Sequence, residues 1–390
     1  MNRTQRAALG GTVALALACL GACITAPTAT DLEWLDGTHA RAAGPALRVR
    51  WTRDLAPPFS GRYVPVERAA AALDPDGARL YIGSNQGVLW ALRQDGAPLF
   101  KHTTNAGIEA APVVDGARGE VYLATTRGQV QRLDADTGTV RWQGQAAGPV
   151  SAAPLLTEDA VYVVTDEDAI IALARKDGSV LWRYRREPRE GLAIEGRAGL
   201  TRTPRGIVTG FEDGAVVMLD ASDGRVLWEF DTSDQFGDAE SNFIDVDTTP
   251  ALVDDVVYVA SFTGGAYALD VAGGGVQWHE PKLTGVTHAA ATQDLVLFAS
   301  AQRGIVCLDR NTHAPRWVQA PERGAPGAIH LERGIAYVAE TLGALRAFAL
   351  SNGRELGRLE TAHGITSPPS LARGQGYVLS NAGRLFAVAY

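Results

Sequence analysis

The segment Gly128-Gln-Val-Gln-Arg-Leu-Asp-Ala-Asp-Thr-Gly-Thr-Val-Arg-Trp142 decides the fold of this chain. Its first half alternates apolar and polar residues, which is typical of a β-strand. Asp136-Thr-Gly138 follows as a tight-turn signature, because glycine tolerates the positive φ that such turns need. A second extended run then ends at Trp142. The segment therefore predicts a β-hairpin whose second strand carries a large aromatic residue.

This hairpin recurs along the chain, which indicates a repeat architecture. Counted on the apolar residue that ends the first strand of each hairpin, successive copies lie 41, 40, 46, 50, 39, 40 and 40 residues apart. The eight positions are Leu92, Leu133, Leu173, Leu219, Leu269, Leu308, Phe348 and Val388. Short β-branched and apolar runs before each hairpin, such as residues 110–114 and 121–125, supply two further strands. Four strands in about forty residues is the pattern of a propeller blade.

The two ends of the repeat complement each other. The last unit stops at Tyr390 after its third strand, and the missing fourth strand matches Leu47-Arg-Val-Arg-Trp51. We therefore predict an all-β fold: a single eight-bladed β-propeller over residues 46–390 with four-stranded blades, the last closed by the N-terminal strand. Six of the eight tryptophans occupy one repeat position, where packing between blades is expected rather than a ligand site: Trp51, Trp142, Trp182, Trp228, Trp278 and Trp317.

Residues 1–22 have the organisation of a secretory signal. Two arginines precede an apolar stretch over residues 7–20, which is shorter than the roughly 20 residues of a membrane span. The stretch runs into Leu20-Gly-Ala-Cys23, which resembles a bacterial lipobox and predicts cleavage before Cys23 and lipidation of that residue. An ordinary cleaved signal peptide, or an uncleaved anchor, is the alternative.

The lipidated cysteine and a tether are expected to occupy residues 23–45, which are rich in Ala, Thr, Pro and Gly. Ile24 after the cysteine, rather than Asp, favours the outer membrane under the sorting rule of enteric lipoproteins. Cys307 lies in an apolar run and is interpreted as a buried small hydrophobe rather than a reactive thiol. The formal net charge of -8 argues against a nucleic-acid partner, which needs a basic stripe.

Two inter-blade crossings are longer than the rest, by 6 and by 10 residues over a spacing of 40. They cover residues 185–197 and 231–247, follow one another in the repeat, and are predicted to lie side by side on one rim. Long loops on a regular scaffold commonly carry binding sites. Apolar residues in these polar loops suit a protein contact: Leu192, Ile194, Phe243 and Ile244. The alternatives are that these side chains cap the blade core and that Asp245 and Asp247 cap a turn.

The repeat resembles that of quinoprotein-type propellers, with its Ala/Leu-Asp-x-x-x-Gly-x-x-x-Trp signature, over residues 46–390. A narrower resemblance is to the BamB lipoproteins of the outer-membrane β-barrel assembly machinery. It rests on the lipobox, the tether, the eight blades, and the run Asp245-Val-Asp-Thr-Thr-Pro250. In addition, Leu192-Ala-Ile-Glu-Gly196 is similar to that family's Leu-x-Leu-Arg-Gly loop.

The BamB resemblance implies a non-catalytic scaffold without a cofactor, lipid-anchored at the outer membrane and facing the periplasm. It implies that the two loops contact the periplasmic domains of the barrel-assembly channel, and that nascent outer-membrane proteins are possible further partners. Carried onto this sequence, the contacts are Leu192, Ile194, Asp245 and Asp247, with Phe243 in the same loop. Glu195 stands where the family has Arg, and Arg197 is the candidate substitute.

Two other functions remain open from the sequence. A quinone-dependent oxidoreductase would use the same propeller with Ca²⁺, but no Cys-Cys pair and no assignable Glu/Asn/Asp ligand set is present. The chain has seven scattered histidines without metal spacing, and His288 and His330 are interpreted as satisfied structural residues. No hydrolase, metalloprotease or phosphate-loop motif occurs, so no enzyme activity is expected. The third possibility is a propeller that binds another cell-envelope protein.

Overall fold

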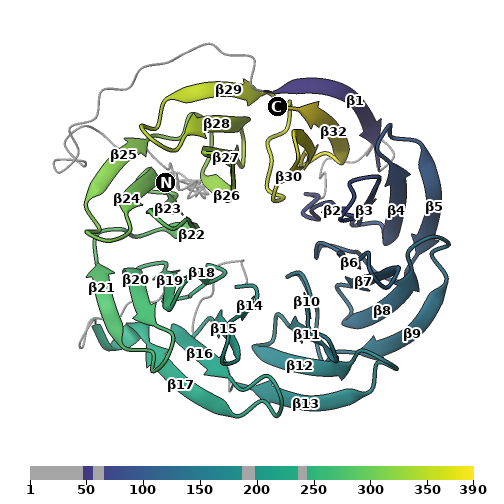
Figure 1. Cartoon of the computed structure of the whole chain (residues 1–390), viewed down its shortest axis with the longest axis horizontal. Helices are drawn as coiled ribbons and strands as arrows, with labels where there is room; N and C mark the ends of the chain where they lie inside the picture. The colour runs from purple at the N-terminus through teal and green to yellow at the C-terminus, as the bar shows by residue number, and fades with distance from the viewer. Residues whose placement is uncertain (1–46, 56–65, 187–197, 236–243) are drawn as a thin grey trace, which may run out of the picture.

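Figure 1 shows the computed structural model of the chain, in which eight β-sheets are arranged as a ring. The structure describes residues 47–55, 66–186, 198–235 and 244–390. The signal, Cys23 and the tether, all predicted within residues 1–45, lie outside the described residues. The eight-bladed, all-β prediction is confirmed: each sheet has four antiparallel strands, consecutive in sequence in seven sheets and closed by the N-terminal strand in the eighth.

Each of blades 1 to 7 is a meander of four consecutive strands, counted from the central strand outwards. Blades 1 to 4 contain β2 Ala72–Leu73, β3 Arg79–Ile82, β4 Val88–Arg93, β5 Pro98–Thr103, β6 Val113–Asp115, β7 Glu120–Ala124, β8 Gln129–Asp134, β9 Val140–Gln145, β10 Leu155–Leu156, β11 Ala160–Val164, β12 Ala169–Ala174, β13 Val180–Arg185, β14 Thr201–Arg202, β15 Ile207–Gly210, β16 Ala215–Leu219 and β17 Val226–Asp231. A short 3-10 helix, η2 Thr232–Gln235, follows β17.

The second half of the ring continues in the same way. Blades 5 to 8 contain β18 Ala251–Val253, β19 Val256–Ser261, β20 Gly265–Asp270, β21 Val276–Glu280, β22 Val286–Ala291, β23 Leu295–Ser300, β24 Gly304–Asp309, β25 Pro315–Gln319, β26 Pro326–Glu332, β27 Ile335–Glu340, β28 Leu345–Ala349, β29 Glu355–Leu359, β30 Ser370–Ala372, β31 Gln375–Leu379 and β32 Arg384–Ala389, with β1 Arg48–Asp54 as the outer strand of blade 8.

Blade 8 joins the two ends of the chain, as the sequence predicts. Strand β1 pairs antiparallel with β32, from Arg48 opposite Ala389 to Asp54 opposite Arg384. The Arg384 guanidinium also contacts the Asp54 carboxylate, with Nε and Oδ1 2.7 Å apart. The closing strand is therefore held by an antiparallel ladder, with one register shift between Val49 and Trp51, and by an ion pair, and Figure 1 shows it beside the C-terminus.

The antiparallel meander gives the ring two faces that differ in their loops. The hairpin face carries the turns between the first and second strands and between the third and fourth strands of each blade. The crossing face carries the turns between the second and third strands and the connections from one blade to the next. The long connections before β14 and before β18 therefore belong to the crossing face. A third long connection, the 17 residues between β1 and β2, lies on the same face and was not predicted from the repeat spacing.

The repeated tryptophans hold neighbouring blades together on the hairpin face. Trp142 lies in the outer strand of blade 2, is 8% exposed, and donates its indole N–H to the Arg175 carbonyl of blade 3 at 2.8 Å. Its ring packs on Gly178, whose φ of +74° places the backbone against the indole. The same contact of an aromatic ring with a turn glycine recurs at Trp51–Gly96, Phe100–Gly138, Trp182–Gly224, Trp228–Gly274 and Trp317–Gly353. The packing role predicted for these tryptophans is confirmed at these joints.

Two joints depart from this pattern for visible reasons. Between blades 5 and 6, His313 occupies the glycine position with φ +54° and stacks on Trp278, with ring centroids 4.6 Å apart. Between blades 7 and 8, Gly357 replaces the tryptophan in β29. Blade 8 has no hairpin turn at that place, because its third and fourth strands are the two ends of the chain. A tryptophan at position 357 would have no turn to pack on.

Candidate functional site: two crossings beside blade 4

The first long crossing leaves blade 3 through a residue that is fixed to blade 4. Arg186, directly after β13, forms ion pairs with Asp213 at 2.6 Å and with Glu229 at 3.0 Å. Its side chain is 17% exposed and that of Asp213 is 8% exposed. The Arg186 guanidinium also lies 5.5 Å from the centre of the Phe211 ring. The described start of this crossing is thus anchored on the turn between β15 and β16.

The second long crossing begins and ends against the same turn. Thr232 donates its hydroxyl to the Gly214 carbonyl at 2.8 Å, and Val246 donates its N–H to the Phe211 carbonyl at 3.1 Å. Between them, the Ile244 carbonyl accepts the Ser261 hydroxyl of blade 5 at 2.8 Å. The ends of this crossing therefore bridge blades 4 and 5.

The two crossings also meet each other where they return to the sheets. The N–H of Gly199 donates to the Thr249 hydroxyl at 2.8 Å, and the Thr201 hydroxyl donates to the Pro250 carbonyl at 2.6 Å. The sequence predicts that these crossings lie side by side on one rim, and their described ends do so. This surface, formed by the described ends of both crossings around Asp213 and Gly214, is called the blade 4 rim below.

The predicted contact residues are only partly described. Asp247 is half-buried on the blade 4 rim, whereas Asp245 is 2% exposed. The Asp245 carbonyl accepts the N–H of Phe262 at 2.9 Å, so this residue fixes the rim to blade 5 from within. The remaining predicted contacts, Leu192, Ile194, Glu195, Arg197 and Phe243, lie outside the described residues. Their partner contacts, like those of Asp245 and Asp247, stay a prediction.

Sequence reasoning missed the residues that anchor the rim. Arg186 falls within the long crossing but carries no motif, and Asp213 lies 27 residues away in another blade. The only available signal is the acidic residue Asp213 in the β15–β16 turn. Aspartates are common in turns because their side chains hydrogen-bond the backbone of the turn itself. The pairing therefore becomes visible only when the blades are placed next to each other.

Replacing Arg186 with glutamine is expected to destabilise the protein by about 3 kcal/mol, because Asp213 is left buried without its cation. Urea unfolding measures this loss, and hydrogen exchange at Phe211 and Val246 should accelerate with it. Arg185→Gln is the matched control, since Arg185 is 64% exposed and lies 3.8 Å from Glu167. The control should change the stability by less than about 0.5 kcal/mol. Equal losses in the two variants would show that Arg186 is not the anchor.

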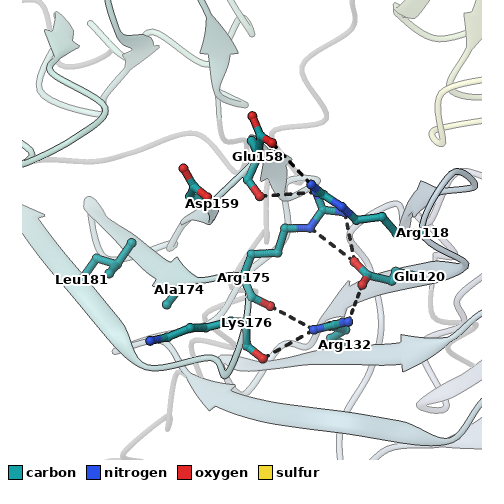
Figure 2. A pocket seen from close by; sticks show the side chains of 9 residues that line it. All are labelled: Arg118, Glu120, Arg132, Glu158, Asp159, Ala174, Arg175, Lys176 and Leu181. Carbon is teal, nitrogen blue, oxygen red and sulfur yellow. Dashed lines mark hydrogen bonds and ion pairs between the residues drawn. The ribbon is translucent and has the colours of Figure 1, made fainter.

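A second candidate site is a cavity of about 420 Å³ on the hairpin face between blades 2 and 3 (Figure 2). It is lined by Arg118, Glu120, Arg132, Glu158, Asp159, Ala174, Arg175, Lys176 and Leu181. Glu120 is the centre of its charged groups: Arg175 lies 3.0 Å from one carboxylate oxygen, and Arg132 contacts the other. Arg175 also contacts Asp115, and Arg118 lies 3.8 Å from Glu158.

The charges in this cavity neutralise one another. Arg175 is 7% exposed and receives additional support from the Thr157 carbonyl at 2.9 Å. The Tyr122 hydroxyl accepts from Arg175 and donates to Glu120, and burial raises the pKa of Tyr122 to about 12. A tyrosine with this pKa remains protonated at neutral pH and supplies no base. The arrangement fits a structural ion-pair cluster that joins two blades.

Cys307 and the side chains that could bind a metal are the remaining described groups of chemical interest. Cys307 is fully buried, as predicted, and burial raises the pKa of its thiol to about 12, so it is not a nucleophilic thiolate. Among the described residues, no three His, Cys, Asp or Glu side chains gather as metal ligands. Within the same residues, no helix is both long and apolar enough to cross a membrane.

His288 differs from its predicted role as a satisfied structural histidine. It lies in β22, the innermost strand of blade 6, and its Nδ1 is buried without a hydrogen-bond partner among the described residues. Burial lowers the pKa of His288 to about 4. The folded protein therefore holds this imidazole neutral, while the unfolded chain protonates it near pH 6.5.

This difference predicts an acid-sensitive stability. Because the folded-state pKa lies below the unfolded one, the contribution of His288 is complete above about pH 6.5 and is lost as the pH falls towards 4. Between about pH 7 and pH 5, the loss attributable to His288 should be about 1–2 kcal/mol. Urea unfolding of the unchanged protein and of His288→Gln at both pH values measures it. His363→Gln, at an exposed histidine, is the control. An identical pH dependence for all three proteins would contradict the assignment.

Comparison with known proteins identifies the family. The family model described as "Outer membrane protein assembly factor BamB" matches residues 116–319, which is more than half of the chain. A protein named outer membrane protein assembly factor BamB from Yersinia pestis is 23% identical over 70% of this chain and 70% of its own length.

Solved structures support the fold. The crystal structure of BamB from Moraxella catarrhalis superposes with a TM-score of 0.74 at 21% identity, covering 88% of this chain and all of that one. The quinohemoprotein alcohol dehydrogenase from Comamonas testosteroni shares the propeller with a TM-score of 0.67 at 12% identity, covering 90% and 78%. Identities this low show fold and not activity. From the family match, this chain belongs to the family of the outer membrane protein assembly factor BamB.

Proposed function

We propose that this protein is a non-catalytic scaffold of the outer-membrane β-barrel assembly machinery. It binds the periplasmic domains of the barrel-assembly channel through the crossing face near blade 4 and assists the insertion of outer-membrane proteins. The proposed site consists of the residues predicted from the resemblance, with Asp245 holding the rim in place rather than touching the partner: Leu192, Ile194, Glu195, Arg197, Phe243, Asp245 and Asp247. A lipid on Cys23 keeps the protein at the outer membrane, facing the periplasm.

The observation that carries this proposal is the convergence of two successive long crossings on one turn of blade 4. Five of the eight connections between blades have ten residues or fewer, so residues beyond that length are not required to join two blades. Both crossings are nevertheless anchored. Arg186 fixes the start of the first, and Thr232 and Val246 fix the two ends of the second. Loops held at fixed points on a rigid scaffold are suited to binding. Membership of a family whose relatives are named assembly factors supports the choice of partner.

The expected binding chemistry follows from the residue types. Leu192, Ile194 and Phe243 can bury apolar area against a partner, while Asp247 on the rim offers an acceptor at the border. Apolar contacts surrounded by polar ones are the usual arrangement of a protein interface. Asp245 is expected to act indirectly, because its burial serves to hold the rim in place.

Co-purification from detergent-solubilised outer membranes tests the proposal. The triple variant Leu192→Ala, Ile194→Ala and Asp247→Ala is expected to lose the channel at least tenfold, since hot-spot residues carry most of the binding energy. The matched control is Asp177→Ala, Val180→Ala and Leu181→Ala, which removes the same residue classes from exposed positions on the hairpin face of blade 3. Retention of the channel by the triple variant would refute the site. Mass spectrometry of the mature N-terminus decides whether Cys23 is acylated.

A quinone-dependent oxidoreductase is the second candidate, because the propeller is shared with a quinohemoprotein alcohol dehydrogenase. Such an enzyme needs pyrroloquinoline quinone bound together with Ca²⁺. The described residues do not fit this pair, since they provide no cluster of acidic side chains for Ca²⁺. Incubation with pyrroloquinoline quinone and Ca²⁺, followed by spectroscopy and a dye-linked assay, separates the two candidates. A stable quinone-bound form would favour the oxidoreductase over the scaffold.

A further inference from the structure

The hairpin face of blades 7, 8 and 1 carries exposed arginines close to the point where the described chain begins. We call this group the basic edge: Arg48, Arg93, Arg333, Arg354 and Arg373. Arg333 and Arg373 occupy first-to-second-strand turns, Arg93 and Arg354 border third-to-fourth-strand turns, and Arg48 opens β1. The antiparallel topology brings all these positions to the same face.

Contacts between the blades join these positions into one surface. The N–H of Arg373 in blade 8 donates to Glu332 of blade 7 at 3.0 Å, and the hydroxyl of the C-terminal Tyr390 contacts the same carboxylate. On the other side, Trp51 of blade 8 donates its indole N–H to the Gln94 carbonyl of blade 1 at 2.9 Å. Gln94 directly follows Arg93, so the basic edge is continuous across three blades.

The arginines of the basic edge differ from the other arginines of this face in their pairing. Arg118, Arg132 and Arg175 in blades 2 and 3 are all paired with carboxylates. Among the described residues, no carboxylate lies within ion-pair distance of Arg48, Arg93, Arg354 or Arg373, and Arg333 lies 3.7 Å from Glu332. Their charges therefore remain available to a partner outside the ring.

The surrounding charge is also asymmetric in a chain whose formal net charge is -8. On the hairpin face of blades 7 and 8, four exposed arginines are opposed by Glu332 and the terminal carboxylate, while Glu355 beside Arg354 is buried and paired with Arg346. Blades 4 and 5, on the opposite side of the ring, carry an excess of negative charge on this face. Two arginines stand there against five aspartates: Arg205 and Arg225, and Asp220, Asp223, Asp254, Asp255 and Asp270. The basic edge is thus a local feature and not a consequence of composition.

Two of these arginines stand where the backbone favours other residues. Arg333 and Arg373 have φ of +49° and +56°, and each is followed by a glycine that also has positive φ. Such turns prefer Asn, Asp or Gly at the first position, and an arginine there costs roughly 1 kcal/mol. Residues kept at a cost in backbone strain are candidates for function.

We propose that the basic edge lies against an anionic phospholipid surface, at the place where the propeller joins its lipid-bearing N-terminal segment. This inference rests on the proposed lipidation of Cys23. The 25 residues from Cys23 to Leu47 span at most roughly 80 Å, so the start of β1 cannot lie farther than that from the lipid. Arginines near an anionic headgroup layer add attraction within about a Debye length. Val49, which is 47% exposed beside Arg48, adds an apolar contact to the same surface.

The arrangement also orients the protein. The basic edge belongs to the hairpin face, whereas the blade 4 rim belongs to the crossing face and lies on the far side of the ring (Figure 1). A propeller that rests on lipid through blades 7, 8 and 1 therefore presents the blade 4 rim away from the membrane. Periplasmic domains of a membrane-embedded channel are then within reach of both long crossings.

Vesicle co-sedimentation of the mature chain carrying Cys23→Ser tests the proposal without the lipid anchor or the channel. We expect binding to vesicles of phosphatidylethanolamine with about one third phosphatidylglycerol, and little binding to phosphatidylcholine vesicles. The triple variant Arg48→Gln, Arg354→Gln and Arg373→Gln should bind at least tenfold more weakly, since each basic residue near the surface is worth about fivefold. Raising the ionic strength from about 0.05 M to 0.5 M should abolish the difference.

The matched control is Arg141→Gln, Arg225→Gln and Arg316→Gln. These arginines are 56%, 65% and 57% exposed, and each lies near an aspartate of its own hairpin. The control removes the same charge, so equal weakening would show that net charge and not the basic edge is responsible. Equal binding to both vesicle types, or none to either, would also overturn the proposal. Acylation and channel binding are measured separately, so failure here leaves the proposed function standing.

Discussion

Trp142→Ala is expected to lower the free energy of unfolding by about 4–5 kcal/mol. The side chain is 8% exposed, and truncating a buried tryptophan typically costs about 3–5 kcal/mol. The change also leaves the Arg175 carbonyl without its indole donor at 2.8 Å. Trp142→Phe should lose only about 1–2 kcal/mol, because the ring is kept and one hydrogen bond is lost. Blade 1 already uses Phe100 at this position.

The opposite side of the same joint gives a control for crowding. A Cβ added at Gly178 lies 2.6 Å from Trp142 Cε3, so Gly178→Ala should cost about 3 kcal/mol through clash and backbone strain together. Gly119 has a similar φ of +65°, but a Cβ there meets nothing within 4 Å. Gly119→Ala should therefore cost only about 1 kcal/mol. Urea unfolding of both variants separates packing from strain, and equal losses would contradict the joint described here.

Arg346→Met is expected to destabilise the protein by about 3–5 kcal/mol, the usual effect of removing one partner from a buried ionic group. The Arg346 guanidinium lies 2.9 Å from Glu340 and 2.8 Å from Glu355, and the three side chains are 5%, 1% and 8% exposed. Glu340 also accepts the N–H of Glu322 at 3.0 Å, which ties the crossing from blade 6 into blade 7. This cluster stabilises the one blade that carries no aromatic residue at the outer repeat position.

Two further variants distinguish the unpaired charges from lost packing. Adding Glu340→Gln and Glu355→Gln to Arg346→Met should restore part of the stability, because no buried carboxylate is then left without a cation. Arg354→Gln, at an exposed arginine of the same blade, should change the stability by less than about 0.5 kcal/mol. If the triple variant is less stable than Arg346→Met, the cluster does not act through charge pairing.

The repetitive part of the fold could be predicted from the sequence because each blade repeats the same local signals. Asp136-Thr-Gly138 predicts a turn with positive φ, and Gly138 has φ of +70°. The regular position of the tryptophans predicts packing between blades, and the short last repeat predicts closure by β1, which pairs with β32. These features depend on residues close in sequence or on one fixed period.

The parts that could not be predicted depend on residues that are far apart and occur once. Arg175 meets Asp115 across 60 residues, and Arg186 meets Asp213 across 27, without any repeated signal. Gly357 replaces tryptophan because the neighbouring blade 8 has no turn between its third and fourth strands, which are the two ends of the chain. This reason is visible only in the structure. For the candidate site, the sequence predicts that the crossings before β14 and β18 are long, whereas the structure is needed to show that both are anchored beside Gly214.

Site-specific photo-crosslinking in intact cells tests the central claim most directly. A photoreactive residue placed at position 247, on the blade 4 rim, should form an adduct with the barrel-assembly channel. The same residue at position 352, in an exposed turn of the hairpin face of blade 7, should not. Adducts with the channel from position 352 and none from position 247 would contradict the account, because the crossing face would then not be the binding surface.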